Sequence, residues 1–270
     1  MSIYSKLSAL LTAANTKTGE SDTTLTDAVQ TLIDGYGQGG GGIDWDDYAA
    51  GLEPSGQSVL DTTTQLVIKN KFSYMTSLTS FSAPLLTTIT GINMFQADAN
   101  LETVNLPNVT NLPTNCFYDC KKLTGGNFPK VTEIGASALS FAGQSVSGSI
   151  FVLPEIVTIG NDGLRQVNDY AVIDLGPNLT KIPDKCFYNH TYKGILILRA
   201  SSVVPCNSSS AIWALSRPNS VATVYVPQSL ITTYQNDTNW SLAYAAGTNF
   251  TAIEGTTYAT HYADGTVIPT

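Results

Sequence analysis

Apolar residues recur with a period of 22 to 25 residues through the middle of the chain, and prolines mark that period. Apolar side chains follow each of five prolines at two, five and ten positions. The prolines are Pro84, Pro107, Pro129, Pro154 and Pro177. Repeats of this length, each burying its apolar face only against its neighbours, are typical of solenoids. The pattern therefore predicts an extended surface for contact rather than a pocket for chemistry.

Each repeat begins with a short strand, seen most clearly in residues 101–106 ahead of Pro107. Proline ends the hydrogen-bonded ladder because it has no N–H to donate. A degenerate first repeat covers residues 59–75, where Phe72 precedes Met94 by 22 residues and joins the same inward row. We therefore expect an α/β-type solenoid with a short parallel β-sheet, preceded by a small helical hairpin.

Alternate side chains of these strands face outward and form a candidate contact surface. Its residues are Ser82, Thr103, Asn105, Asn127, Ile150, Val152, Val172 and Asp174. The early rungs of this face are small and polar, whereas the later rungs present three aliphatic side chains. An apolar strip on a polar sheet indicates a contact site. Two alternatives stay open: the C-terminal segment covers the strip, or the strand register is shifted by one residue.

The ends of the chain differ from the repeats. Residues 1–36 carry two amphipathic helical patterns, and a hairpin of this size is too small to be stable alone. Its apolar positions form a candidate assembly face: Ile3, Leu7, Leu10, Leu11, Leu25, Val29, Leu32 and Ile33. We expect the hairpin to anchor the chain or to form a homo-oligomer; the alternative is an inert cap.

Four segments follow from these patterns: the hairpin at 1–36, a glycine-rich linker at 37–42, the repeats at 43–200, and a C-terminal cap and tail at 201–270. Consecutive glycines keep the linker flexible. In the cap we expect a final strand at 224–227 and a helix near 229–236. Trp240 and Tyr244 are predicted to close the exposed apolar end.

Charge and composition exclude several classes of function. The net charge is -8, and only 13% of residues are charged. Such a surface disfavours nucleic acid and anionic membranes, both of which need clustered Lys and Arg. No stretch is long and apolar enough for membrane insertion. The two histidines, His190 and His261, come with no catalytic motif, so we expect no enzyme and no cofactor.

We also expect no metal site. Asp44, Asp46 and Asp47 match no EF-hand spacing, and a solvated turn is the simpler interpretation. Cys116 and Cys120 have a metal-like spacing, but no second ligand pair completes a tetrahedral site. Cys116 and Cys186 occupy one repeat position, which other repeats fill with Asn93, Ala138 and Gly163. These small inward positions predict buried structural thiols.

The repeats resemble the BspA-like class of bacterial leucine-rich repeats. The resemblance rests on VNLPNVTNLPTNCFYDCKKL at 104–123 and IDLGPNLTKIPDKCFYN at 173–189. The segment YVPQSLITTYQNDTNW at 225–240 is similar to the cap of such proteins in phages and prophages of gut Firmicutes. The start, LTDAVQTLIDG at 25–35 before the glycine run, resembles the head of phage structural proteins.

This resemblance implies a phage virion structural or receptor-binding protein, located in the virion and without catalysis. Its partners would be other virion proteins at the hairpin and a host-surface glycan or protein at the sheet. Two alternatives stay open: a bacterial surface or secreted adhesin, located extracellularly or on the bacterial cell, and a purely architectural decoration protein. The first residues lack a signal-peptide pattern, which favours the phage interpretation over the adhesin.

Overall fold

The computed structural model describes residues 45–50, 55–67, 69–188, 192–217 and 221–269. The predicted hairpin, its assembly face and the glycine linker lie outside these residues. The described chain starts with α3 (Trp45–Ala49) and α4 (Ser55–Leu60). The sequence predicted a solvated turn at Asp44, Asp46 and Asp47. Asp46 and Asp47 instead belong to α3, where Asp46 is exposed, and Asp44 lies outside the described residues. Trp45 anchors that helix by packing its ring 5.2 Å from Phe72.

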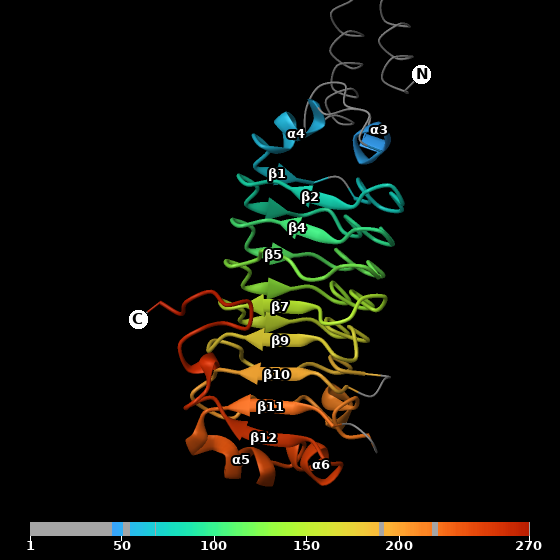
Figure 1. Cartoon of the computed structure of the whole chain (residues 1–270). Helices are drawn as coiled ribbons and strands as arrows, with labels where there is room; N and C mark the ends of the chain where they lie inside the picture. Colours follow the sequence, from blue (N-terminus) through green and yellow to red (C-terminus); the bar gives the residue numbers. More distant parts are fainter. Residues whose placement is uncertain (1–44, 51–54, 68, 189–191, 218–220, 270) are drawn as a thin grey trace, which may run out of the picture.

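Parallel strands one repeat apart build the main sheet, which runs the length of the stack in Figure 1. Its strands are β2 (Ser80–Ser82), β4 (Thr103–Asn105), β7 (Ile150–Leu153), β9 (Val172–Leu175), β10 (Ile195–Leu198), β11 (Thr223–Val226) and β12 (Asn249–Ala252). Parallel bridges from Asn105 to Asn127 and from Gly125 to Ile150 connect β4 with β7. Strands paired one repeat apart give the α/β repeat fold expected from the period.

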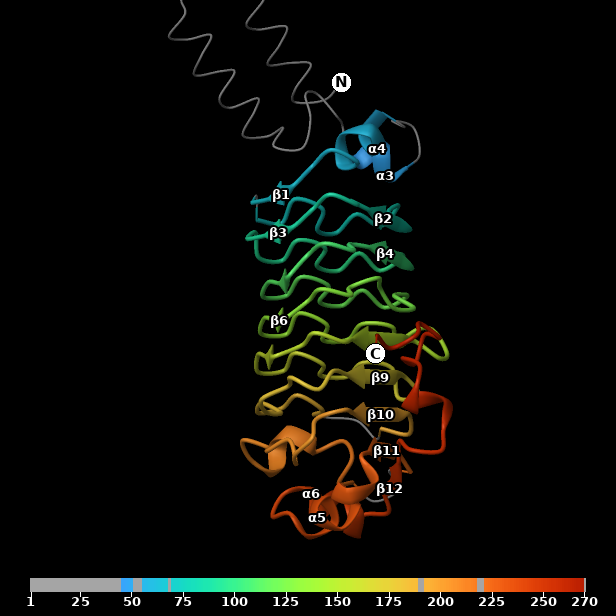
Figure 2. The ribbon, with the colours of Figure 1, turned by 90° about the vertical axis from the view of Figure 1, so that its left-hand side faces the viewer.

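A second row of shorter strands lies behind the main sheet, at the left in Figure 2. These strands are β1 (Gln65–Leu66), β3 (Thr88–Ile89), β5 (Asn111–Leu112), β6 (Glu133–Ile134) and β8 (Thr158–Ile159). Threonine hydroxyls link consecutive rungs. The Thr132 hydroxyl donates to the Thr110 carbonyl at 3.1 Å, and the Thr180 hydroxyl donates to the Val157 carbonyl at 2.9 Å. These bonds tie each rung to the one before it.

The apolar positions that define the period fill the core between the two rows. Side chains two and five residues after each proline are at most 5% exposed. Removing each such side chain from water stabilises the fold by roughly 1.5–3 kcal/mol. Because every rung covers its neighbours in this way, the core is one continuous column.

The first complete repeat departs from the predicted alignment. Phe72 stacks on Phe95 at 5.3 Å, and Phe95 stacks on Phe117 at 5.0 Å, so Met94 is not the partner of Phe72. The repeat after Pro84 holds one residue more than the next repeat before its stacked phenylalanine. Asn93 is therefore a left-handed turn residue (φ 56°) that is only half-buried, and not a small inward position.

Cys116 and Cys186 lie in the core, as their shared repeat position predicts. Cys116, Cys120 and Cys186 are wholly buried and Cys206 is half-buried, all as free thiols. Burial raises the pKa of the Cys116, Cys120 and Cys186 thiols above the usual value. A thiol with a raised pKa holds little of the reactive thiolate. The described residues contain no group of three His, Cys, Asp or Glu side chains placed to hold a metal ion.

The C-terminal end is closed by more structure than the sequence indicates. After η1 (Ser209–Ile212) and β11 come η2 (Gln228–Leu230), α5 (Ile231–Asn236) and α6 (Trp240–Ala245). The predicted strand at 224–227 is present as β11, and the predicted helix near 229–236 is present as η2 and α5. β11 is not the last strand, because β12 pairs parallel with it. Trp240 is fully buried and donates through Nε1 to the Val204 carbonyl at 2.8 Å, whereas Tyr244 stays 49% exposed.

Beyond β12 the chain turns back along the outer face of the main sheet. Residues 253–269, which we call the tail, include η3 (Thr257–Ala259). In Figure 2 the tail lies at the right of the stack, beside β9 and β10. It reaches the level of β7 and leaves the earlier rungs uncovered (Figure 1).

Candidate interaction surface

The outer face of the early rungs is open and polar. Ser80, Thr103 and Asn127 are exposed, and Ser82 and Asn105 are half-buried. All five come from β2, from β4 or from the bridge that follows β4. We call this region the open half of the main sheet. It contains four of the predicted contact residues.

Hydrogen bonds between rungs hold the polar side chains of the open half in a row. Asn127 Nδ2 donates to Asn105 Oδ1 at 2.7 Å, and Asn105 Nδ2 donates to Ser82 Oγ at 3.0 Å. Gln57 of α4 extends the row by donating through Nε2 to the Ser82 carbonyl at 3.1 Å. A side chain already held by neighbours loses less conformational entropy when it binds a partner. The row is therefore preorganised for polar contacts.

The tail covers the outer face of the later rungs. Asp174 has no exposed surface and Val152 is 8% exposed, while Ile150 and Val172 are half-buried. The predicted strand register is right, because Val152 pairs with Asp174 and their neighbours Phe151 and Ile173 lie in the core. The prediction that Val152 and Asp174 form part of an open face is wrong; the structure bears out the alternative that the C-terminal segment covers them.

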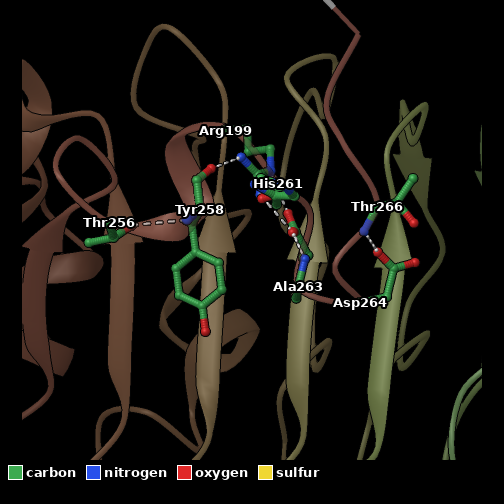
Figure 3. Close-up of polar contacts among 8 residues, drawn as sticks. Arg199, Thr256, Tyr258, His261, Ala263, Asp264 and Thr266 are labelled. Carbon is green, nitrogen blue, oxygen red and sulfur yellow. Dashed lines mark hydrogen bonds and ion pairs between the residues drawn. The ribbon is translucent and has the colours of Figure 1, made fainter.

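A buried ion pair fastens the tail to the sheet (Figure 3). The Arg199 guanidinium, at the end of β10, binds both carboxylate oxygens of Asp174 at 2.6 and 2.8 Å. The same guanidinium donates to the tail carbonyls of Tyr258 at 2.7 Å and of His261 at 3.0 Å. The Ala263 N–H donates to Asp174 Oδ2 at 2.9 Å. Both charged groups are thus satisfied by one another and by tail backbone.

Aromatic rings pack around this ion pair. The Arg199 guanidinium lies 5.0 Å from the centre of the Tyr262 ring, within the range of a cation–π contact. Tyr258 meets Tyr225 of β11 edge to face at 4.9 Å. Sequence reasoning missed Arg199 and the tail residues. One signal in the sequence could have indicated this ion pair. Asp174 and Arg199 are 25 residues apart, about one repeat, so they lie on consecutive rungs, where opposite charges can pair.

A cavity of about 250 Å³ lies where the end of the tail meets the open half. Asn127, Val152 and Glu155 contribute the sheet side, and Tyr262 and Asp264 contribute the tail side. Glu102, Glu133 and Glu155 are exposed and lie on separate rungs. His261 bonds its own neighbour Thr260 at 2.8 Å through Nδ1. The fixed polar row of the open half, rather than these separate groups, is the arrangement that suits a contact surface.

The comparison with known families agrees with this geometry. The model for the BspA type leucine rich repeat region matches six copies, over residues 57–146 and 87–208. The chain belongs to this family. BspA-type leucine-rich repeats are scaffolds for protein interaction or adhesion and are typically non-catalytic. No curated protein and no solved structure matches the chain. Among the described residues, every helix is too short or too polar to cross a lipid bilayer.

Proposed function

We propose that this BspA-type repeat protein is a phage virion structural or receptor-binding protein. Its open half contacts a glycan or protein on the host surface, and no catalysis is involved. One observation carries the recognition half of the proposal: the row Ser82–Asn105–Asn127 is fixed by hydrogen bonds and keeps exposed surface in the described part of the chain, while the tail lies over Val152 and Asp174. Fixed hydroxyl and amide groups suit the polar surface of a glycan or a protein loop.

Weak contacts on one chain become strong binding when several copies act together. The proposed hairpin would supply those copies by joining the chain to itself and to other virion proteins. A bacterial surface or secreted adhesin with the same repeats is the alternative, and an architectural decoration protein without a ligand is the third candidate.

The assembly half of the proposal predicts an oligomer. The full chain should scatter light as a multiple of its 28.7 kDa mass. The double variant Leu10→Asp, Leu32→Asp should scatter as a monomer, because charges on the assembly face oppose its burial. The matched control is Thr12→Asp, Thr31→Asp, which adds the same charge at polar positions. A monomeric full chain, or equal masses for all three proteins, would contradict the anchoring role.

The recognition half predicts binding to bacterial cells. Fluorescently labelled full chain should adsorb to some strains in a panel of Gram-positive gut bacteria, with saturation. Trypsin treatment of those cells removes protein receptors, and periodate treatment oxidises glycans. Loss of adsorption after one treatment identifies the receptor class. Absence of saturable adsorption to every strain would favour the architectural alternative, and adsorption by the monomeric double variant equal to that of the full chain would favour a free adhesin.

A further inference from the structure

A second surface lies on the turn side of the stack, where aromatic and basic side chains follow one another from rung to rung. We call it the aromatic–basic ridge, and it consists of Tyr118, Phe141, Arg165, Tyr188, Trp213 and Arg217. Trp213 directly follows η1, which lies to the right in Figure 1, whereas the tail lies to the left. The ridge is therefore separate from the sheet face.

The members of the ridge are in continuous contact. Tyr118 meets Phe141 at 5.2 Å, and the Arg165 guanidinium lies between two rings, 5.6 Å from Phe141 and 5.7 Å from Tyr188. Tyr188 then meets Trp213 at 6.0 Å, with Arg217 5.8 Å from the Trp213 ring. These side chains hold one another in place, so a partner meets a largely ordered surface.

Arg165 has fewer acceptors than its guanidinium can use. A guanidinium carries five N–H donors. The only acceptor for Arg165 in the described part of the chain is Asp162 Oδ1, at a long 3.4 Å, and its Nε is buried with no hydrogen-bond partner. The side chain is 32% exposed, so other N–H groups are accessible from outside. An under-bonded cation at the surface favours a partner that brings carboxylate oxygens.

The local charge has the opposite sign to that of the molecule. Arg165, Arg217 and Lys185 each lie over a ridge ring, with the Lys185 ammonium 5.9 Å from Tyr188. Three carboxylates lie close by: Asp162 pairs with Arg165, Asp184 accepts a hydrogen bond from the Ser208 hydroxyl at 2.6 Å, and Asp119, next to Tyr118, pairs with Lys121 at 3.5 Å. With Lys121 counted, four cations against three carboxylates leave a positive surface on a chain of net charge -8.

The composition of the ridge matches the energetic centres of protein interfaces, which are enriched in Trp, Tyr and Arg. Trp213 is 41% exposed, a large apolar area for a partner to cover. The ridge spans four rung spacings of about 4.8 Å each, or about 20 Å. That length suits the core of an interface of about 800 Å² per partner.

We propose that the aromatic–basic ridge binds an acidic segment of a partner protein. Carboxylates of that segment pair with Arg165 and Arg217, and an apolar or aromatic side chain packs on Trp213. The inference goes beyond the proposed receptor contact and does not depend on it, because it concerns a different face and a partner of stated charge.

The test uses the full chain and a random copolymer of glutamate and tyrosine as the acidic probe. Trp213 reports binding, because the other two tryptophans, Trp45 and Trp240, are 9% and 0% exposed. The copolymer should protect Trp213 from acrylamide quenching in a saturable, salt-sensitive way. The double variant Arg165→Gln, Arg217→Gln should bind the copolymer at least about tenfold more weakly, since each charged hydrogen bond contributes roughly 1.5–3 kcal/mol.

Lys130→Gln, Lys181→Gln is the charge-matched control away from the ridge, and it should bind like the unmodified chain. If thermal unfolding shows that the Arg165 variant is destabilised, Arg217→Gln alone should still weaken binding several-fold. Absence of saturable protection at low salt would overturn the proposal, as would equal weakening in the control. Dextran sulfate binding with the same affinity and the same arginine dependence would overturn the assignment to a protein partner.

Discussion

Replacing Asp174 with alanine is expected to lower the free energy of unfolding by about 3–5 kcal/mol, the usual cost of removing one partner from a buried ion pair. The change leaves the Arg199 guanidinium buried without its carboxylate, and it removes the acceptor of the Ala263 N–H. Urea unfolding followed by circular dichroism measures the change in free energy.

Two further variants separate the ion pair from general damage. Asp264→Ala removes an exposed tail carboxylate that accepts the Thr266 N–H at 2.9 Å, and it should change the free energy of unfolding by no more than about 1 kcal/mol. The double variant Asp174→Ala, Arg199→Met should recover part of the loss, because no unpaired charge remains buried. An Asp174→Ala effect as small as that of Asp264→Ala would show that the ion pair does not fasten the tail.

Replacing Asp98 with asparagine is expected to stabilise the protein at neutral pH. The Asp98 carboxyl is fully buried; its Oδ1 accepts the Met75 N–H at 2.8 Å, and its Oδ2 has no partner. Burial raises the pKa of this carboxyl to about 8, although the Met75 N–H opposes the shift. Asparagine keeps the shape and an acceptor for Met75 and carries no ionisable group.

The direction in which stability changes with pH follows from comparing the ionisation of the Asp98 carboxyl in the folded and in the unfolded chain. Below about pH 4 the carboxyl is protonated in both the folded and the unfolded chain, so its ionisation does not affect stability. Between pH 4 and pH 8 it ionises mainly in the unfolded chain, and the free energy of unfolding falls as pH rises. At pH 7 the loss is about 4 kcal/mol for a folded pKa near 8.

Thermal or urea unfolding of Asp98→Asn and the unmodified chain between pH 4 and pH 8 measures this effect. The variant should gain stability relative to the unmodified chain as pH rises, up to the few kcal/mol set by the pKa shift. The matched control, Asp264→Asn, changes an exposed carboxyl and should leave the slope as it is. Identical slopes for Asp98→Asn and the unmodified chain would contradict the burial of an unpaired carboxyl.

The repeat positions were predictable because each rung has the same neighbours. The spacing of the prolines located the buried rows and the buried thiols Cys116 and Cys186. The Asp98 N–H donates to the Phe95 carbonyl, and the Cys120 N–H donates to the Phe117 carbonyl. Asp98 therefore lies at the turn position that Cys120 occupies one rung later. The period alone gave no sign that one of these inward positions holds a carboxyl.

Features without a period were not predictable from the sequence. The sequence left open whether the C-terminal segment covers the later rungs, and because the tail carries no repeat, nothing in its composition fixes its path over β9 and β10. Its position depends on Arg199 bonding Asp174 and tail carbonyls 59 and 62 residues later. Likewise, one additional residue after Pro84 shifts Phe95 into the stacked row, and only the ring contacts reveal the shift.

The open half of the main sheet is the contact surface proposed for this protein, and one binding measurement tests that role most directly. We would compare the adsorption of the labelled full chain with that of the double variant Asn105→Lys, Asn127→Lys, on a bacterial strain that binds the unmodified chain. The variant places two long charged side chains on the fixed polar row, and it should bind at least about tenfold more weakly while its circular dichroism spectrum is unchanged. Asn161→Lys, at an exposed position on the other side of the rungs, is the control and should bind normally. Undiminished binding by the double variant would contradict the account.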